Sequence, residues 1–204
     1  MTITNWLSNN YIEVFGAITG IIYVFLEIRQ TIWLWPLGLV TSGIYVWIFF
    51  TGKLYADMSL QAYYVVISVL GWYWWARGRH VDGEKESTTL QVSRLKLKTA
   101  IALLIVFVLL YSVMFLVLSK LTDSPVPQWD AFLTSLSIVA TWMLARKIYE
   151  HWFLWIVVNF VSVILYFTRG LYPTVVLYFV YGAMSFVGLK AWKKTIREIT
   201  EVQS

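Results

Sequence analysis

The chain has 204 residues, of which 59% are hydrophobic and 13% are charged, and its net charge is +5. Soluble domains carry about 25% charged residues, so this composition excludes an ordinary soluble protein and predicts one that is embedded in a lipid bilayer. The chain has no cysteine, which excludes disulfides and thiol chemistry, and its two histidines give no basis for a histidine metal centre. We therefore expect neither a metal nor a cofactor.

Seven apolar stretches are long enough, or nearly so, to cross a bilayer, which takes roughly 20 residues per helix. In chain order they are residues 10–28, 32–50, 56–76, 100–119, 130–144, 152–168 and 172–189. No Lys or Arg precedes the first stretch and no small-residue cleavage site follows it, which favours a retained helix over a cleaved signal peptide. The predicted fold class is an all-α membrane protein with seven transmembrane helices.

The basic residues are concentrated in alternate connecting segments. If the N-terminus lies outside, 13 of the 16 Lys and Arg residues face the cytoplasm, and only Lys53, Lys120 and Arg169 lie outside. By the positive-inside rule, this asymmetry predicts an external N-terminus and a cytoplasmic C-terminus. It also explains the positive net charge without a nucleic acid partner.

The sequence resembles itself at a shift of 117 residues, which pairs Arg29 with Arg146 and Trp35 with Trp152. The same shift pairs Phe50/Phe167, Thr51/Thr168, Leu54/Leu171, Tyr55/Tyr172, Leu60/Leu177, Tyr64/Tyr181, Ser68/Ser185, Gly71/Gly188 and Trp75/Trp192. Chance similarity between apolar helices would explain the leucines, but not the arginines, glycines and tyrosines. We therefore predict a duplication.

The duplication divides a single transmembrane domain, residues 1–204, into five segments. They are a three-helix repeat (10–76), a cytoplasmic loop (77–99), a connector helix (100–119), a second three-helix repeat (130–192) and a cytoplasmic tail (193–204). The connector crosses the membrane once, so the second repeat starts on the same side of the membrane as the first. The two repeats are therefore parallel, in a 3+1+3 arrangement. In transporters built from repeats, the substrate binds near the membrane midplane where the repeats face each other.

The residues expected at midplane are polar but uncharged, because the ionisable side chains fall near the helix ends. This distribution favours passive facilitated diffusion over proton-driven transport. Trp152, Trp155, Asn159 and Ser162 follow the spacing i, i+3, i+7, i+10 and so share one helical face. The other candidate substrate-binding residues are Thr41, Ser42, Gln61, Tyr64, Ser68 and Tyr181. Flat aromatic faces with a few hydrogen-bonding groups suit a small aromatic solute.

Other interpretations of these residues stay open. Trp152 lies near its helix end and equally fits an interfacial aromatic belt, and the serines fit close packing between helices. Asn159 also fits a structural hydrogen bond between helices. A receptor or scaffold without transport would have little use for a duplication around a polar midplane. The predicted spans contain neither a nucleophile–base pair nor metal ligands, so we do not expect an enzyme.

Four groups of residues together form a specific pattern. They are Trp152-x-x-Trp155-x-x-x-Asn159; Leu54-Tyr55-Ala56 followed by Gln61 and Gly71-Trp72; Trp129-Asp130 followed by LSIVA at 136–140; and Arg146-Lys147 leading to Glu150. In these groups the sequence resembles the PnuC family of bacterial vitamin transporters. The resemblance implies a 3+1+3 fold similar to that of SWEET sugar facilitators, commonly a homotrimer, in the bacterial inner membrane.

The same resemblance implies uptake of a vitamin or vitamin precursor down its gradient, with a cytoplasmic kinase that traps the solute by phosphorylation. Trp152, Trp155, Asn159 and Gln61 would contact the solute. Nicotinamide riboside is the first candidate. Thr41 stands where nicotinamide riboside transporters tend to carry asparagine, and residues 26–36 look like those of PnuT thiamine transporters. Thiamine is therefore the nearest alternative, followed by a SWEET-like sugar facilitator.

Overall fold

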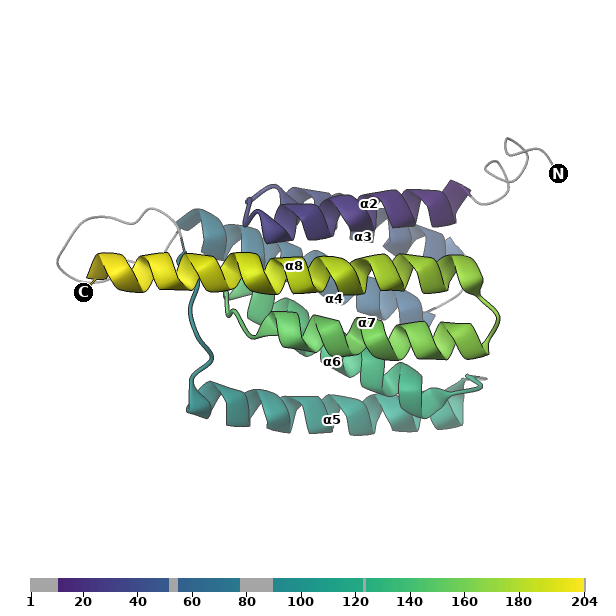
Figure 1. Ribbon diagram of the computed structural model, residues 1–204. Helices are drawn as coiled ribbons and strands as arrows, with labels where there is room; N and C mark the ends of the chain where they lie inside the picture. The colour runs from purple at the N-terminus through teal and green to yellow at the C-terminus, as the bar shows by residue number, and fades with distance from the viewer. Residues whose placement is uncertain (1–10, 52–54, 78–89, 123, 204) are drawn as a thin grey trace. The chain divides into compact units, whose positions relative to one another are not determined.

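The computed structural model describes residues 11–51, 55–77, 90–122 and 124–203, and these residues form seven α-helices (Figure 1). The helices are α2 (Tyr11–Ile28), α3 (Leu34–Thr51), α4 (Tyr55–Arg77), α5 (Leu97–Leu121), α6 (Pro127–Ala145), α7 (His151–Thr168) and α8 (Tyr172–Gln203). Within these residues the β-pairing is limited to an isolated bridge between Ser93 and Ile148. The predicted all-α fold with seven helices is confirmed.

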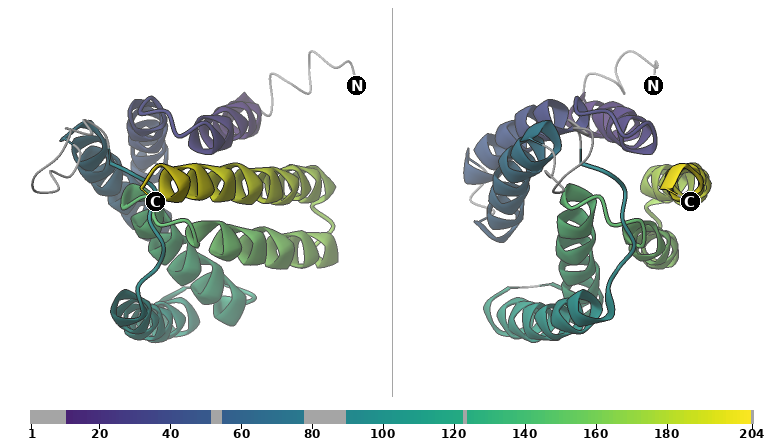
Figure 2. Two further views of the ribbon diagram at one scale, coloured as in Figure 1. Left: turned by 60° about the vertical axis from the view of Figure 1, so that its left-hand side comes forward. Right: turned by 90° about the vertical axis from the view of Figure 1, so that its left-hand side faces the viewer.

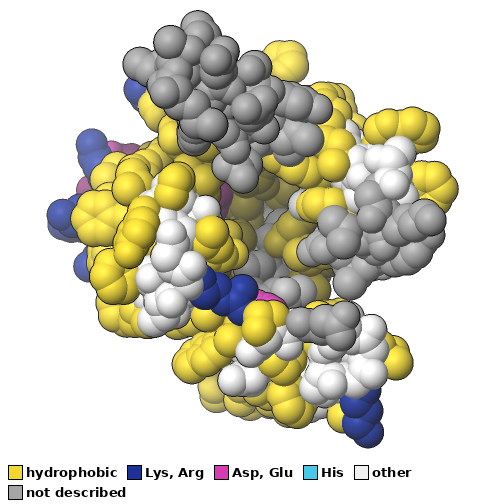
Figure 3. Space-filling view, turned by 90° about the vertical axis from the view of Figure 1, so that its right-hand side faces the viewer, with side chains coloured by type: hydrophobic (Ala, Val, Ile, Leu, Met, Phe, Trp, Pro, Cys, Tyr) yellow, Lys and Arg dark blue, Asp and Glu magenta, His cyan; other side chains and the backbone are white. Residues whose placement is uncertain are grey.

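The helices differ in how much of their surface is buried and in how apolar they are. By length and composition, α3, α5, α7 and α8 are each long and apolar enough to cross a membrane. α5 has no buried residue, whereas α6 has eight. A helix exposed to lipid must be apolar all round, but one enclosed by protein need not be. Among the side chains that Figure 3 colours by type, hydrophobic ones are the most abundant on this face.

The chain forms two compact units, Met1–Trp72 and Tyr73–Ser204. In the first unit, α2 packs against α3. In the second unit, α5 packs against α6, α6 against α7 and α7 against α8, and both views of Figure 2 show α7 and α8 side by side. α4 is one continuous helix whose last residues, from Tyr73 onward, belong to the second unit.

Each unit contains a tight turn of the same construction, at positions related by the 117-residue shift. Gln30 and Lys147 both adopt left-handed backbone conformations, with φ of 54° and 49°. The backbone hydrogen bonds also match: Gln30 N–H to Glu27 O and Lys147 N–H to Leu144 O, Thr31 N–H to Leu26 O and Ile148 N–H to Met143 O. The two copies of this stretch therefore fold into the same local structure.

Each of these two turns is followed by a tryptophan whose ring packs on a glycine. The Trp35 ring lies on Gly71 in the first unit, and the Trp152 ring lies on Gly188 in the second. Both rings are almost completely buried, with exposed fractions of 0% and 1%. A methyl group at either glycine would overlap the ring. The glycines therefore let an indole lie flat against the neighbouring helix.

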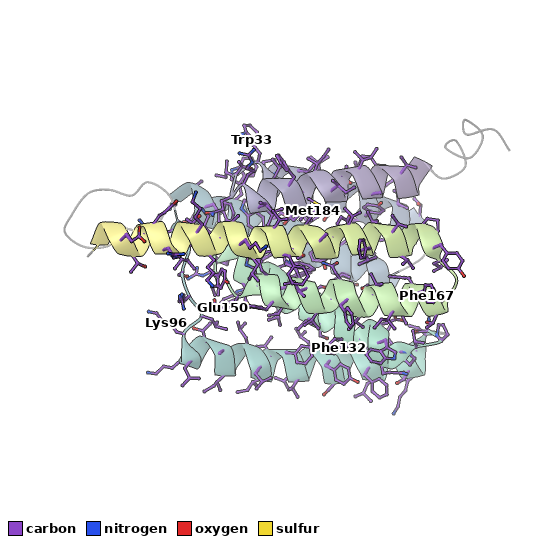
Figure 4. The ribbon with its side chains drawn as sticks, viewed as in Figure 1. Trp33, Lys96, Phe132, Glu150, Phe167 and Met184 are labelled. Atoms are coloured by element: carbon purple, nitrogen blue, oxygen red, sulfur yellow. The ribbon has the colours of Figure 1, made fainter. Side chains whose placement is uncertain are left out.

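The turn between α6 and α7 holds the segment that precedes α5. Ser93 N–H donates to Lys147 O, and Tyr149 N–H donates to Ser93 O, both at 2.9 Å. The Leu95 N–H donates to the Glu150 carboxylate at 2.8 Å. Figure 4 places Glu150 and Lys96 at one end of the second unit and Phe167, near the other end of α7, at the opposite end. The segment is thus fastened to the residues that begin α7.

The same turn also binds the end of α4. Trp75 Nε1–H donates to the Ala145 carbonyl at 3.2 Å, and the Lys147 ammonium lies 4.2 Å from the centroid of the Trp75 ring. The Arg146 guanidinium lies 4.8 Å from the centroid of the Trp74 ring. Burial lowers the pKa of Lys147 to about 8, while the facing indole attracts the charged form. The two cations of the turn thus form cation–π contacts with two consecutive tryptophans of α4.

The Glu150→Ala variant is expected to loosen the segment before α5. A hydrogen bond to a charged group contributes about 1.5–3 kcal/mol, so the Leu95 amide should exchange its hydrogen roughly 10–150-fold faster. Hydrogen–deuterium exchange measured by mass spectrometry reads this directly. Glu198→Gln, which removes a carboxylate from an exposed pair with Lys194, is the control and should leave this segment unchanged. Equal exchange in both variants would contradict the role of Glu150.

Candidate functional site

The predicted polar face of α7 lies largely inside the second unit. Trp152, Asn159 and Ser162 are buried, and Trp155 is half-buried. Two of these residues contact α8, because Asn159 bonds Ser185 and Trp152 packs on Gly188. The residues i and i+7 of a helix lie on one face, two turns apart. Asn159 and Trp152 therefore lie on the side of α7 that meets α8.

The Asn159 side chain is held by a short hydrogen-bonded chain. Asn159 Nδ2–H donates to Ser185 Oγ at 3.2 Å, and Ser185 Oγ–H donates to the Tyr181 carbonyl at 2.8 Å. Asn159 is 5% exposed. A side-chain amide has two N–H donors and one carbonyl acceptor with two lone pairs. Ser185 takes one donor, so the amide is fixed in orientation and keeps further groups that suit a ligand.

Trp155 stands one turn before Asn159 on α7. Its indole Nε1 is buried and meets no hydrogen-bond acceptor among the residues that the structure describes. A buried polar group without a partner costs about 1–3 kcal/mol, and the acceptor of a bound solute would remove that cost. Trp155 and Asn159 together offer an aromatic face, an N–H donor and an amide.

Trp152 lies two turns from Asn159, in the packed contact between α7 and α8. Its ring lies on Gly188, with the Trp192 ring at 6.0 Å and the His151 ring at 4.7 Å between centroids. This packing explains the burial of Trp152 without a solute. Its direct contact with a solute stays a prediction.

The candidates from the first unit also lie partly inside it. Ser42 and Ser68 are buried, whereas Thr41, Gln61 and Tyr64 are half-buried. Ser68 Oγ lies only 3.0 Å from where a Cβ on Gly38 would stand, so this glycine makes room for the hydroxyl group. The structure thus brings Ser68 of α4 close to α3.

Tyr181 of α8 is half-buried, and its ring lies 5.9 Å from that of Tyr178, which in turn stacks on Tyr166 at 5.2 Å. Ser185, the partner of Asn159, is absent from the residues predicted to bind substrate. The duplication contains the signal for it, because Ser185 corresponds to Ser68. By the same shift Asn159 corresponds to Ser42, so the amide is present in one copy alone.

Comparison with known proteins gives consistent matches over most of the chain. The model of the family described as "Nicotinamide mononucleotide transporter" matches residues 10–194. The chain is 27% identical to the "Nicotinamide riboside transporter PnuC" of Escherichia coli (strain K12), over 93% of this chain and 87% of that protein. It is 28% identical to the "Riboflavin/roseoflavin transporter RibM" of Streptomyces davaonensis, over 92% of both chains.

A solved structure, described as "Crystal structure of the Vitamin B3 transporter PnuC", is similar to this one. The TM-score is 0.73 at 25% sequence identity, over 96% of this chain and 86% of that chain. The likeness therefore extends over nearly the whole helical fold.

Proposed function

The chain belongs to the nicotinamide mononucleotide transporter family, and from that premise we propose that this multi-pass membrane transporter carries nicotinamide riboside by facilitated diffusion. The observation that carries the proposal is that the Asn159 amide, fixed by Ser185, and the buried Trp155 indole N–H stand about one turn apart on α7. Nicotinamide riboside has a flat pyridinium ring with a carboxamide group. Such a ring stacks on an indole, and its carboxamide pairs with a side-chain amide. The names of the PnuC relatives support the same solute.

A riboflavin-like solute is the second candidate, because the RibM relative covers as much of the chain at a similar identity. Its ring system is also flat and bears amide-like groups, so the same tryptophan and asparagine would suit it. Thiamine and a hexose are the remaining candidate substrates, and a binding test has to compare all four solutes.

Four finer features belong to the same proposal. The domain contains two parallel three-helix repeats, at 10–76 and 130–192, which the matching turns at Gln30 and Lys147 support. The N-terminus lies outside and the C-terminus inside a bacterial inner membrane, which the distribution of Lys and Arg supports. The protein assembles as a homotrimer. A cytoplasmic kinase traps the solute, since a carrier that lacks an energy source cannot move it against its electrochemical gradient.

The substrate is tested with the purified protein in liposomes. Tryptophan fluorescence is titrated with nicotinamide riboside, riboflavin, thiamine and a hexose, and uptake of each labelled solute is then measured. We expect nicotinamide riboside to bind most tightly and to enter by counterflow. Preferential binding and uptake of riboflavin, thiamine or the hexose would reject the proposed substrate and identify its replacement.

The passive mechanism predicts that uptake stops when the internal and external concentrations are equal, whatever the pH gradient. Nicotinamide riboside carries a positive charge, so the membrane potential is held at zero with valinomycin and equal potassium on both sides. If transport were coupled to protons, the proton would be carried by the buried Glu27 carboxylate at the end of α2, which is 2% exposed. Accumulation above the external concentration under a pH gradient, lost in Glu27→Gln, would overturn passive transport.

A further inference from the structure

The last helix continues well past the start of its neighbour α7. Trp192 of α8 packs edge-on against Trp152, in the first turn of α7, and eleven residues of α8 follow Trp192. At about 1.5 Å per residue, they carry the helix roughly 16 Å further, and Figure 1 shows this extension beyond the start of α7. The 18 residues of α7 span about 27 Å, close to the roughly 30 Å of the hydrocarbon core, so we expect the extension to lie outside the hydrocarbon.

One side of α8 is packed from its middle into its extension. Ser185, Gly188, Trp192 and Ile196 are all buried, and they recur at the three- and four-residue spacing of a single helical face. The packed face therefore continues from the middle of the apolar part of α8 into its extension, which fixes the rotation of the extension about its own axis.

The exposed side of α8 changes from apolar to basic residues at Lys190. Within the apolar part it presents the exposed residues Val176, Phe179, Phe186 and Val187. Directly beyond them, the exposed residues Lys190, Lys193, Lys194 and Arg197 continue the same stripe at the spacing i, i+3, i+4, i+7. Lys194 forms an exposed pair with Glu198 at 3.7 Å, so the net positive charge of the stripe comes mainly from Lys190, Lys193 and Arg197.

We propose that the basic stripe of Lys190, Lys193, Lys194 and Arg197 binds the headgroups of anionic phospholipids. The four residues span about 10 Å of helix, which is enough to cross the headgroup layer of one leaflet, roughly 5–8 Å deep. They lie at the end of a stripe that faces acyl chains, so a lipid whose tails lie on Phe179 and Phe186 has its phosphate beside the cations. A free phosphate ion lacks this apolar continuation. The proposal depends on the membrane location of the chain and not on its substrate.

The test uses the full-length protein in detergent, titrated with phosphatidylglycerol or with phosphatidylcholine of the same acyl chains, with bound lipid counted by native mass spectrometry. The test variant, Lys193→Gln/Arg197→Gln, leaves the Lys194–Glu198 pair in place. The matched control, Lys120→Gln/Arg169→Gln, also removes two exposed cations, near the ends of α5 and α7. Neither variant changes a residue of the candidate substrate site.

We expect phosphatidylglycerol to bind more tightly than phosphatidylcholine, and its affinity to fall about fivefold for each stripe residue removed at low salt. The control should retain the preference, and millimolar inorganic phosphate should not compete. Equal binding of the two lipids, an equal loss in the control, or competition by phosphate would each overturn the proposal. So would a change in the mass of the oligomer in the test variant, because the stripe would then contact a second copy.

Discussion

Asn159→Leu is expected to reduce substrate binding and uptake by roughly 5–150-fold, while the protein still folds. The substitution removes an amide of similar size to leucine and leaves Ser185 Oγ bonded to the Tyr181 carbonyl. The fold therefore loses one neutral hydrogen bond, whereas the solute loses a buried partner, which costs about 1–3 kcal/mol. Uptake into liposomes measures the loss, and size-exclusion chromatography with a thermal melt checks folding.

Ser185→Ala is the matched control for this prediction. It removes the same hydrogen bond, Asn159 Nδ2 to Ser185 Oγ, but keeps the amide. If Asn159 contacts the solute, Ser185→Ala should weaken binding much less than Asn159→Leu. Equal losses of transport and equal shifts in melting temperature in the two variants would show that Asn159 serves as a structural link between α7 and α8.

Gly188→Ala is expected to lower the stability of the second unit by about 1–3 kcal/mol, the usual cost of overfilling a packed interior. Its new Cβ would overlap the Trp152 ring. That ring is held by Trp192 and His151 and is 1% exposed, so it has no free space to move into. The measurement is the melting temperature and the yield of monodisperse protein.

Gly43→Ala provides the comparison, because a Cβ at Gly43 would have none of its described neighbours within 4 Å. Alanine is favoured over glycine inside a helix by about 0.5–1 kcal/mol, so this variant should be neutral or slightly more stable. A Gly188→Ala protein as stable as Gly43→Ala would show that the Trp152 ring can shift at little cost. The Trp152–Gly188 contact would then not be a fixed feature of the fold.

Sequence patterns located most helices closely, because a membrane helix must be apolar over a fixed length. The predicted spans 152–168 and 172–189 begin within one residue of α7 and α8. The end of α8 was not predictable in this way. Hydropathy falls at Lys190, yet the helix continues to Gln203, because Trp192 and Ile196 still pack on their neighbours.

Some features of the candidate site were also predictable from the sequence, and others were not. Helical spacing by itself was enough to put Asn159, Trp155 and Trp152 on one face of α7, since the period of an α-helix is known in advance. The Ser185 partner, 26 residues away, and the packing of Trp152 on Gly188 required the tertiary structure. A tryptophan in a sequence looks the same whether it touches lipid, a solute or a glycine, because those environments are set by the neighbouring helix.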